Sequence, residues 1–308
     1  MYSLVYQFFY WLKRKEKKRR EAGKEASKLL SFLIGYAEWF YNIPVRRWYE
    51  KHPSKKYGLN RKAREQKVIV SFTSYPKRIK DVWLVAETLL RQSVKPDEVI
   101  LWLADSQFDG LQSLPPRLLA LQERGLTIRF CDDLRSHKKY YYAMQEYPED
   151  LIILVDDDTF YSRDMIKKLL EMHRRHPDDI VCMTPAVITH VEDMPSKWRR
   201  RGCREKLEHS YLAQPYTGQG TLYPPHCLDE QHAFCKEKIM ELCPHADDLW
   251  LKLMSMRKGV MVTAIYPYRS FPVTIYGTGE GSLWYINGQD NQNDVQWQNL
   301  LDHYGVEA

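Results

Sequence analysis

From Val68 onward the chain alternates between two patterns of hydrophobic and polar positions. Four short aliphatic runs have the character of buried strands: KVIVSFTSYP, EVILWLAD, LTIRFCDD and LIILVDDD. Between them lie segments with helical spacing of apolar residues, namely residues 79–92, LPPRLLALQERG and HKKYYYAMQEYP. Continuous aliphatic strands that alternate with helices are typical of a mainly parallel sheet covered on both faces. The pattern predicts an α/β domain that starts at Val68.

Each of these four strands ends in polar residues. They are Thr73 and Ser74, Asp105, Asp132 and Asp133, and Asp156 to Asp158. In open α/β sheets ligands bind beyond the carboxyl ends of the strands, so the acids stand where a ligand site is expected. No GxGxxG follows the first strand and no GxxxxGK[ST] occurs, which argues against a dinucleotide fold and a P-loop.

Three consecutive aspartates follow the aliphatic run LIILV. Burying such charges unpaired costs several kcal/mol each, so a positive partner is expected. Carboxylate oxygens are hard ligands suited to Mg²⁺ or Mn²⁺. The alternative is a solvated strand-to-turn junction, which is common for one aspartate and uncommon for three.

Charge is distributed unevenly along the chain. Residues 1–67 carry 18 Lys and Arg against 6 Asp and Glu, a net +12, whereas the remainder carries 28 against 34, a net −6. The basic character therefore belongs to one end, and no nucleic-acid partner is expected. The six cysteines form no CxxC pair, which favours reduced thiols in a cytosolic protein. No cleavable signal peptide is visible.

The N-terminal 67 residues look like a helical segment followed by a linker from Tyr49. Two apolar, aromatic-rich stretches, residues 2–12 and 29–43, flank the basic block KRKEKKRR. Alternation of this kind is typical of an interfacial helix on anionic lipid. An oligomer contact gives the same pattern, and so does packing on the main domain, because periodicity does not separate an interface from a core.

Several segments together resemble a GT-A glycosyltransferase of the kind grouped near glycosyltransferase family 2, of the bacterial surface polysaccharide type. They are VSFTSYPKRI, Asp105, DDLRSHKKYYYAM, LVDDDTFY, GQGTLYPP and CPHADDLWLKLM, spread over residues 68–304. The resemblance implies a GT-A-like, mainly parallel sheet flanked by helices. It also implies a nucleotide-binding half at 68–160 and an acceptor half at 161–308.

The resemblance also implies roles for the strand-end residues. Asp158 would bind the divalent cation, Asp156 would bind the ribose or the metal's water shell, and Asp157 is less certain. The nucleotide would be held by Thr73, Ser74, Tyr75, Arg78 and Asp105, with phosphate reached by Lys138 and Lys139. The alternative for these lysines is that they lie on an exposed helix face. We expect this alternative to hold for one of the two.

A second acid pair, Asp247 and Asp248, opens the helix in CPHADDLWLKLM. Acids at a helix N-terminus suit free N–H groups and the helix dipole. In the family that the chain resembles, the second acid of a similar pair deprotonates the acceptor hydroxyl, which implies inversion at the anomeric carbon. The two roles are compatible within one pair.

Other segments of the second half have weaker signals. The stretch YTGQGTLYPP resembles a Gly-rich loop lining donor and acceptor, in which Gly218 and Gly220 would allow close backbone approach. Trp198 and Trp250 are either sugar platforms or core residues, the commoner fate. Asn293 and Asp294 are expected to cap a terminal helix, and residues 277–292 to form a lid.

The resemblance thus implies a metal-dependent, inverting hexosyltransferase that uses a nucleoside-diphosphate sugar, with a UDP-sugar as the first expectation. Its acceptor would be a saccharide or lipid-linked, and it would sit peripherally on the cytoplasmic face of the membrane. Two rivals remain: a nucleotidyltransferase and a membrane-associated scaffold with a degenerate site.

Overall fold

The structure is a computed structural model that describes residues 11–12, 15, 19, 27–198, 206–265, 273–278 and 291–305. The chain divides into two compact units. One comprises Met1–Lys55 with Ile275–Gly279, and the other comprises Lys56–Thr274 with Glu280–Ala308. Each is described by itself.

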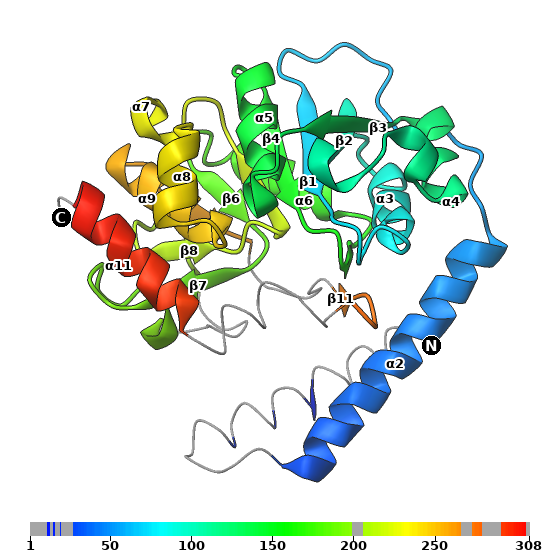
Figure 1. Cartoon of the computed structure of the whole chain (residues 1–308), viewed down its shortest axis with the longest axis horizontal. Helices are drawn as coiled ribbons and strands as arrows, with labels where there is room; N and C mark the ends of the chain where they lie inside the picture. Colours follow the sequence, from blue (N-terminus) through cyan, green and yellow to red (C-terminus); the bar gives the residue numbers. More distant parts are fainter. Residues whose placement is uncertain are drawn as a thin grey trace. The chain divides into compact units, whose positions relative to one another are not determined.

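The first unit is built on the long helix α2 (Lys28–Lys51), shown in blue in Figure 1. Ser27 caps it, because its hydroxyl accepts a hydrogen bond from the Leu30 N–H at 3.3 Å. The predicted stretch 29–43 is therefore one continuous helix that also takes in Tyr49–Lys51, the start of the predicted linker. Of the predicted stretch 2–12, only Trp11 and Leu12 lie among the described residues. No helix in the described part of the chain is both long and apolar enough to span a membrane.

The second unit has a seven-stranded sheet in the order β10-β6-β9-β4-β1-β2-β3. All neighbours pair in parallel except β9, which is antiparallel to β4 and β6. Two small antiparallel pairs, β11-β5 and β7-β8, accompany it. The strands are β1 (Val68–Thr73), β2 (Glu98–Ala104), β3 (Leu126–Cys131), β4 (Leu151–Val155), β5 (Thr159–Phe160), β6 (Ile180–Cys182), β7 (Pro185–Val187), β8 (Ala213–Pro215), β9 (Gln219–Tyr223), β10 (Val262–Ala264) and β11 (Val273–Thr274).

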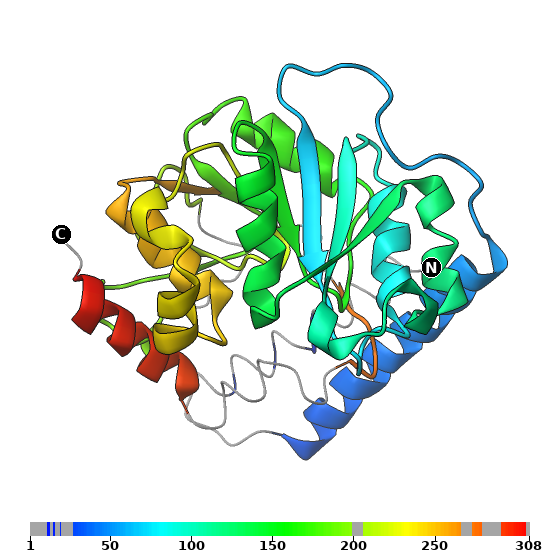
Figure 2. The same ribbon diagram turned by 45° about the horizontal axis from the view of Figure 1, so that its top comes forward.

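Helices flank the sheet, and α5 packs against β1 and β4 (Figure 2). The helices are α3 (Val82–Leu90), α4 (Pro116–Leu119), α5 (Lys138–Glu146), α6 (Met165–His173), α7 (Glu230–Ala233), α8 (Lys236–Leu242), α9 (Asp247–Arg257) and α11 (Gln292–Tyr304). The described 3₁₀ turns are Asp105–Gln107, Leu111–Ser113, Gln122–Arg124, Arg135–His137 and Pro195–Lys197. The predicted α/β fold with a mainly parallel, helix-flanked sheet is confirmed.

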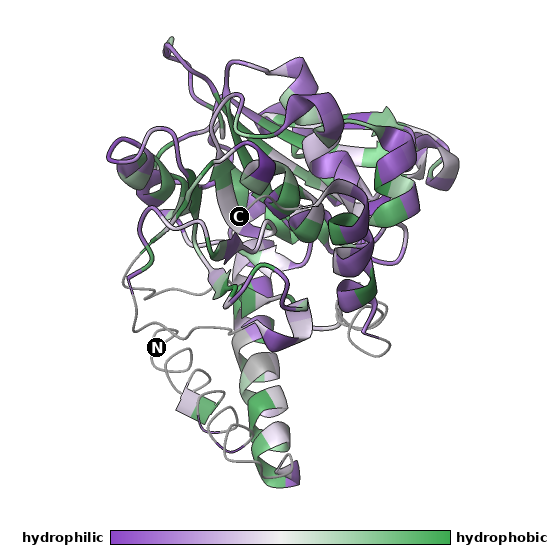
Figure 3. Ribbon diagram, turned by 90° about the vertical axis from the view of Figure 1, so that its left-hand side faces the viewer, coloured by the Kyte–Doolittle hydropathy of each residue, from purple (hydrophilic) through white to green (hydrophobic). Residues whose placement is uncertain are grey.

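Alternation along the strands places the core on both faces of the sheet. Ile69 and Ile152 share one buried cluster with Tyr140 of α5 and Trp250 of α9. Figure 3 shows the hydrophobic residues concentrated on the inner strands, with more hydrophilic helices and loops outside. This burial supplies the main driving force for the fold and fixes where each strand ends.

Strand order reverses between β1 and β4. After β1 the chain adds β2 and β3 on one side, then returns through α5 to place β4 on the other side of β1. Such a switch point is where α/β sheets bind ligands, just beyond the carboxyl ends of the strands. Ser74 follows β1 and Asp156 follows β4, so both stand at this point.

Three sequence expectations need correction. The predicted Gly-rich loop is largely strand β9, in the middle of the sheet. The helix expected in LPPRLLALQERG is only the short α4 followed by a 3₁₀ turn. The terminal helix α11 is preceded by Asn291 at its N-cap position rather than by Asn293 or Asp294. For Trp250 the core alternative is correct, because its side chain is fully buried. Most of the expected lid, residues 279–290, lies outside the described residues.

Candidate active site

The three aspartates after β4 have different surroundings. Asp157 is buried; its carboxylate accepts hydrogen bonds from the Ser74 hydroxyl at 2.5 Å and from Arg78 at 2.6 Å. Asp158 lies 3.1 Å from the same guanidinium and accepts a hydrogen bond from the Thr159 hydroxyl at 3.1 Å. The turn after β1 is therefore tied to the acid cluster through Asp157. Asp157, the least certain of the three aspartates as a nucleotide contact, therefore has a structural role in this structure.

Negative charge exceeds positive charge in this cluster. Burial raises the pKa of Asp158 to about 7, and the neighbouring carboxylates Asp156 and Asp157 add to the effect although Arg78 opposes it. Burial also works against the charge of Arg78, but the two acids outweigh burial and hold its pKa above the ordinary value. The single guanidinium of Arg78 therefore does not neutralise the three carboxylates. A further cation bound there would do so.

Lys139 connects the first acid of this cluster to the second acid pair. Its Nζ lies 2.9 Å from Asp156 Oδ1 and 2.9 Å from Asp247 Oδ2, and its side chain is only 4% exposed. Burial would lower the pKa of Lys139, but the two carboxylates hold it above its ordinary value. One buried ammonium thus joins the end of β4 to the N-terminus of α9, which lie about 90 residues apart in sequence.

Asp247 and Asp248 occupy the first turn of α9 in unlike surroundings. Asp247 accepts a hydrogen bond from the Thr217 hydroxyl at 2.9 Å as well as the contact with Lys139. Burial works to raise the pKa of Asp247, but Lys139 outweighs it and holds that pKa below the usual value. For Asp248, burial and the charge of Asp247 raise the pKa to about 7. The pair therefore contains one fixed carboxylate and one that titrates near neutrality.

Gly218 gives Asp156 the space that it occupies. A Cβ at position 218 would lie 1.7 Å from Asp156 Oδ2. The backbone N–H of Asp156 donates to Gly218 O at 3.0 Å and to the Tyr161 hydroxyl at 2.7 Å, and that hydroxyl in turn donates to Gly218 O. The close backbone approach expected at Gly218 is thus an approach to a predicted metal ligand.

His137 is a site residue that sequence reasoning missed. It is fully buried; its Nε2 donates to Cys243 O at 2.8 Å, and its Nδ1 accepts from the Tyr140 hydroxyl at 3.1 Å. Burial lowers the pKa of His137 to about 4, so it is neutral at physiological pH. The contact ties the start of α5, which carries Lys139, to the segment before Asp247. The only sequence signal for His137 was its place directly before Lys138 and Lys139.

The other nucleotide candidates lie at the same edge but make separate contacts. Thr73 donates its hydroxyl to Trp102 O at 2.8 Å, and the Tyr75 ring lies 5.6 Å from the Arg78 guanidinium. Asp105 is exposed at the start of a 3₁₀ turn. Lys138 pairs with Asp133 at 2.5 Å. Both lysines are buried, so the exposed-face alternative is wrong for each.

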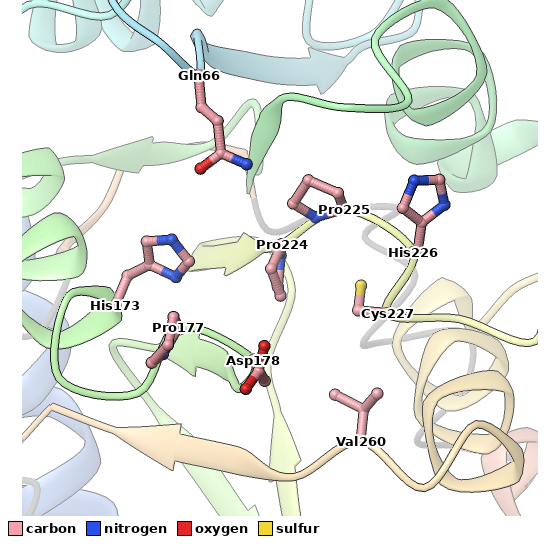
Figure 4. Close-up of a pocket in the computed structure, with 9 residues that line it drawn as sticks. All are labelled: Gln66, His173, Pro177, Asp178, Pro224, Pro225, His226, Cys227 and Val260. Carbon is pink, nitrogen blue, oxygen red and sulfur yellow. The ribbon is translucent and has the colours of Figure 1, made fainter.

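A cavity of about 430 Å³ lies at the opposite edge of the sheet (Figure 4). It is lined by Gln66, His173, Pro177, Asp178, Pro224, Pro225, His226, Cys227 and Val260. These residues precede β1, β6 and β10 or follow the antiparallel β9. None of the acids described above lines it, so the candidate site is identified by its chemistry and not by cavity size.

Comparison with protein families gives one match, to the model described as Glycosyl transferase family 2, over residues 68–229. That range is just over half of the chain and contains β1, β4 and the three aspartates. The chain belongs to glycosyl transferase family 2. The acids Asp247 and Asp248 lie beyond the matched range, so their roles rest on the geometry above. No curated protein matches the chain.

Solved structures similar to this family 2 chain include a mannosyltransferase and TarS of S. aureus. A mannosyltransferase from Pyrobaculum calidifontis, in complex with GDP-Man and Mn²⁺, is 13% identical with a TM-score of 0.43; the match covers 75% of this chain and 63% of that one. TarS 1-349 of S. aureus is 13% identical with a TM-score of 0.48, covering 78% and 72%. TarS 1-349 in complex with UDP-GlcNAc is 14% identical with a TM-score of 0.43, covering 67% and 58%.

Proposed function

We propose that the chain is a metal-dependent glycosyltransferase that transfers a sugar from a nucleoside diphosphate to an acceptor hydroxyl with inversion. The observation that carries this proposal is the bridge made by Lys139, 2.9 Å from both Asp156 and Asp247. It holds the acids at the end of β4 within one site with the acids of α9. Family membership supports the reaction class.

The residues present fit a divalent cation. Asp156 and Asp158 offer only oxygen ligands, which suit Mn²⁺ or Mg²⁺. The space at Gly218 admits the Asp156 carboxylate, and the negative charge around Asp158 exceeds what Arg78 neutralises. When bound, such an ion neutralises charge on the leaving diphosphate. Asp157 contributes indirectly by fixing Arg78 and Ser74.

Asp248 is the proposed general base. With a pKa raised to about 7, its carboxylate is basic enough to accept a proton and is largely ionised at slightly alkaline pH. The acceptor hydroxyl gives its proton to Asp248 while its oxygen forms a bond to the anomeric carbon, and the bond from that carbon to the diphosphate oxygen breaks. Attack opposite the leaving group inverts the configuration. Asp247, held by Lys139 and Thr217, keeps α9 in place.

For the donor, we propose that the residues after β1 and β2 contact the nucleoside, with a UDP-sugar as the first candidate. Ser74 and Arg78 are already positioned by Asp157. Asp105 is exposed to a base or ribose, and the half-buried Tyr75 lies beside Arg78. Lys138 and Lys139 are paired with acids. Their positive charges would therefore favour phosphate binding by offsetting nearby carboxylates, without direct contact with the phosphate.

The test is thermal stabilisation by Mn²⁺ together with UDP, GDP, CMP and TDP compounds, in wild type and Asp158→Ala. A ligand at 100 times its dissociation constant adds about 2.7 kcal/mol to stability. We expect one nucleotide to stabilise the wild type only with metal, and to have no effect on Asp158→Ala. Asp109→Ala, an acid outside the site, serves as the matched control and should respond like wild type.

The rival functions give different results in the same test. A nucleotidyltransferase would favour a free nucleoside triphosphate over the diphosphate. A scaffold with a degenerate site would show no stabilisation with any nucleotide in the presence of metal. Either result would overturn the proposed reaction.

We further propose that the enzyme works at the cytoplasmic face of the membrane on a saccharide or lipid-linked acceptor of a surface polysaccharide. Side chains on α2 support an interfacial position: Leu29, Phe32, Tyr36 and Phe40 are 46–69% exposed. They recur at helical spacing beside a strongly basic segment, which is the composition of a helix that binds anionic lipid. A second copy of the chain is the alternative occupant of this helix face.

A further inference from the structure

A histidine–aspartate cluster lies at the edge of the sheet opposite the active site. Asp179 immediately precedes β6 and is 2% exposed. Its Oδ1 lies 2.9 Å from His209 Nδ1, and its Oδ2 lies 3.8 Å from His176 Nδ1. Because β4 and β6 run in the same direction, Asp179 stands at the amino edge, whereas Asp156 stands at the carboxyl edge.

The three groups can converge on one ion. A ligand atom from each of His176, Asp179 and His209 lies within 4.8 Å of the others. Bonds of about 2.0–2.1 Å in a tetrahedral zinc site place ligand atoms roughly 3.3 Å apart. His209 Nδ1 lies 2.9 Å from Asp179 Oδ1 and His176 Nδ1 lies 3.8 Å from Asp179 Oδ2, so the two imidazoles approach the two oxygens of one carboxylate. Side-chain rotations within the 4.8 Å cluster would bring both rings and one of these oxygens to a common ion.

Two further residues orient these groups. His176 Nε2 lies 2.8 Å from Glu208 Oε1, which leaves Nδ1 directed at Asp179. The Thr263 hydroxyl donates to Asp179 Oδ2 at 2.6 Å. A carboxylate on the remote nitrogen of a ligating histidine and a hydrogen bond to a ligating carboxylate are the usual outer contacts of protein metal sites.

The backbone at His209 supports a role for its side chain. His209 has φ of 51°, in the left-handed region that few non-glycine residues adopt. Its N–H donates to the Thr263 hydroxyl at 2.7 Å, which fixes this conformation beside Asp179. A strained residue held by its surroundings points to a functional constraint.

We propose that His176, Asp179 and His209 bind a Zn²⁺ ion as its three protein ligands, with water in the fourth position. Two imidazole nitrogens and one carboxylate suit zinc, whereas the all-oxygen set at Asp156 and Asp158 suits Mn²⁺ or Mg²⁺. The ion joins three segments: the turn after α6, the residue before β6 and the strand-edge segment that pairs with β10 through Ser210 and Val262. Zinc therefore stabilises the outer edge of the sheet and takes no part in sugar transfer.

The test uses zinc alone and the full-length Asp158→Ala protein, so that the acids after β4 do not contribute. Zinc content after dialysis is measured for this protein and for the same protein with His209→Asn. Asparagine adopts positive φ readily but lacks the ring nitrogen. We expect about one zinc per chain in the first and a loss of tenfold or more in affinity in the second. His226→Asn, another exposed histidine between carboxylates, is the matched control and should keep the zinc.

Two readouts separate a metal site from a hydrogen-bonded cluster. Zinc should raise the Tm of Asp158→Ala but not that of Asp158→Ala with His209→Asn, and Co²⁺ should give the visible absorption of tetrahedral coordination. In a protein with Asp158 intact, His209→Asn should keep metal-dependent nucleotide binding. Equal zinc content with and without His209, or no bound zinc in any variant, overturns the proposal and leaves Asp179 as a hydrogen-bond anchor. Neither result bears on the sugar-transfer site.

Discussion

Asp247 and Asp248 show how neighbouring residues of the same type acquire different chemistry. Lys139 and Thr217 bind Asp247, and the charge of Lys139 outweighs burial and holds the pKa of Asp247 low. Burial and the Asp247 charge raise the pKa of Asp248. Separation of two pKa values by their surroundings is the usual way in which a site divides roles between two acids.

The pH dependence of turnover tests the role of Asp248. Because the base must be ionised, kcat should fall about tenfold per pH unit below about 7 and level off above it. Asp248→Asn should lose this limb together with 10²-fold or more of kcat, while donor binding is kept. If Asp248→Asn keeps the fall in kcat at low pH, that fall belongs to another titrating group.

The stability of Asp248→Asn provides the control for this experiment. The pKa of Asp248 is raised in the folded protein, so its contribution to stability is greatest below its unfolded pKa and is lost as pH rises towards 7. Asp248→Asn should therefore be more stable than wild type at pH 8, with the difference shrinking on acidification. A less stable variant at pH 8 would contradict the raised pKa.

Lys139 is the residue on which the two acid groups depend together. Lys139→Met leaves Asp156 and Asp247 without their shared cation, and should lower the free energy of unfolding by roughly 3 kcal/mol and weaken metal-dependent donor binding. Denaturant unfolding and nucleotide titration measure the two effects. Lys252→Met is the matched control, because Lys252 is also fully buried in the second unit but donates to Tyr211 O. Unchanged donor binding in Lys139→Met would show that the Lys139 bridge is not needed for the donor site.

At the scale of elements, the turn before β9 matters because it passes against Asp156. Gly218→Ala would place a methyl group 1.7 Å from Asp156 Oδ2, so the carboxylate or the turn must move. We expect the apparent Mn²⁺ affinity to fall tenfold or more, as measured by titration in the presence of nucleotide. Gly35→Ala, where a Cβ meets nothing within 4 Å, should leave it unchanged. Equal metal affinity in both variants would remove Asp156 from the metal site.

The sequence predicted the elements whose pattern is local. β1, β2, β3 and β4 are continuous aliphatic runs, so their type and order followed from periodicity. Periodicity did not predict β9, because GQGTLY is short, contains glycine and is buried only by pairing with β4 and β6.

The same limit applies to the candidate site. The acids Asp156 to Asp158 were found because three charges after a buried strand are unusual. The bridge by Lys139 was missed because it joins residues distant in sequence, and nothing local distinguishes Lys139 from Lys138. Long-range contacts of this kind depend on the topology of the sheet.

At the scale of the whole molecule, charge separates the proposed tasks. The N-terminal 67 residues carry net +12 and the remainder net −6. We propose that an anionic membrane attracts the first part, and that the acidic site requires a cation to bind a diphosphate. We expect the full-length protein to sediment with vesicles containing phosphatidylserine and to be released as salt rises.

The exposed face of α2 supplies the apolar part of this interaction. Phe32→Ser with Tyr36→Ser should weaken vesicle binding several-fold without altering the stability of the second unit. Val295→Ser, which also changes an exposed apolar residue, is the control. If the α2 variant binds vesicles normally but changes the oligomeric state, this helix face is an interface between copies of the chain.

The most direct measurement follows donor binding and turnover in the same preparations. Nucleoside diphosphate release from the stabilising nucleotide sugar is measured with Mn²⁺ for wild type, Asp158→Ala and Asp248→Asn, beside calorimetric titration of the nucleotide. Asp158→Ala should lose both binding and turnover, whereas Asp248→Asn should bind normally and turn over at least 10²-fold more slowly. Wild-type turnover in Asp248→Asn, or nucleotide binding that is equally tight without metal, would contradict the proposed mechanism.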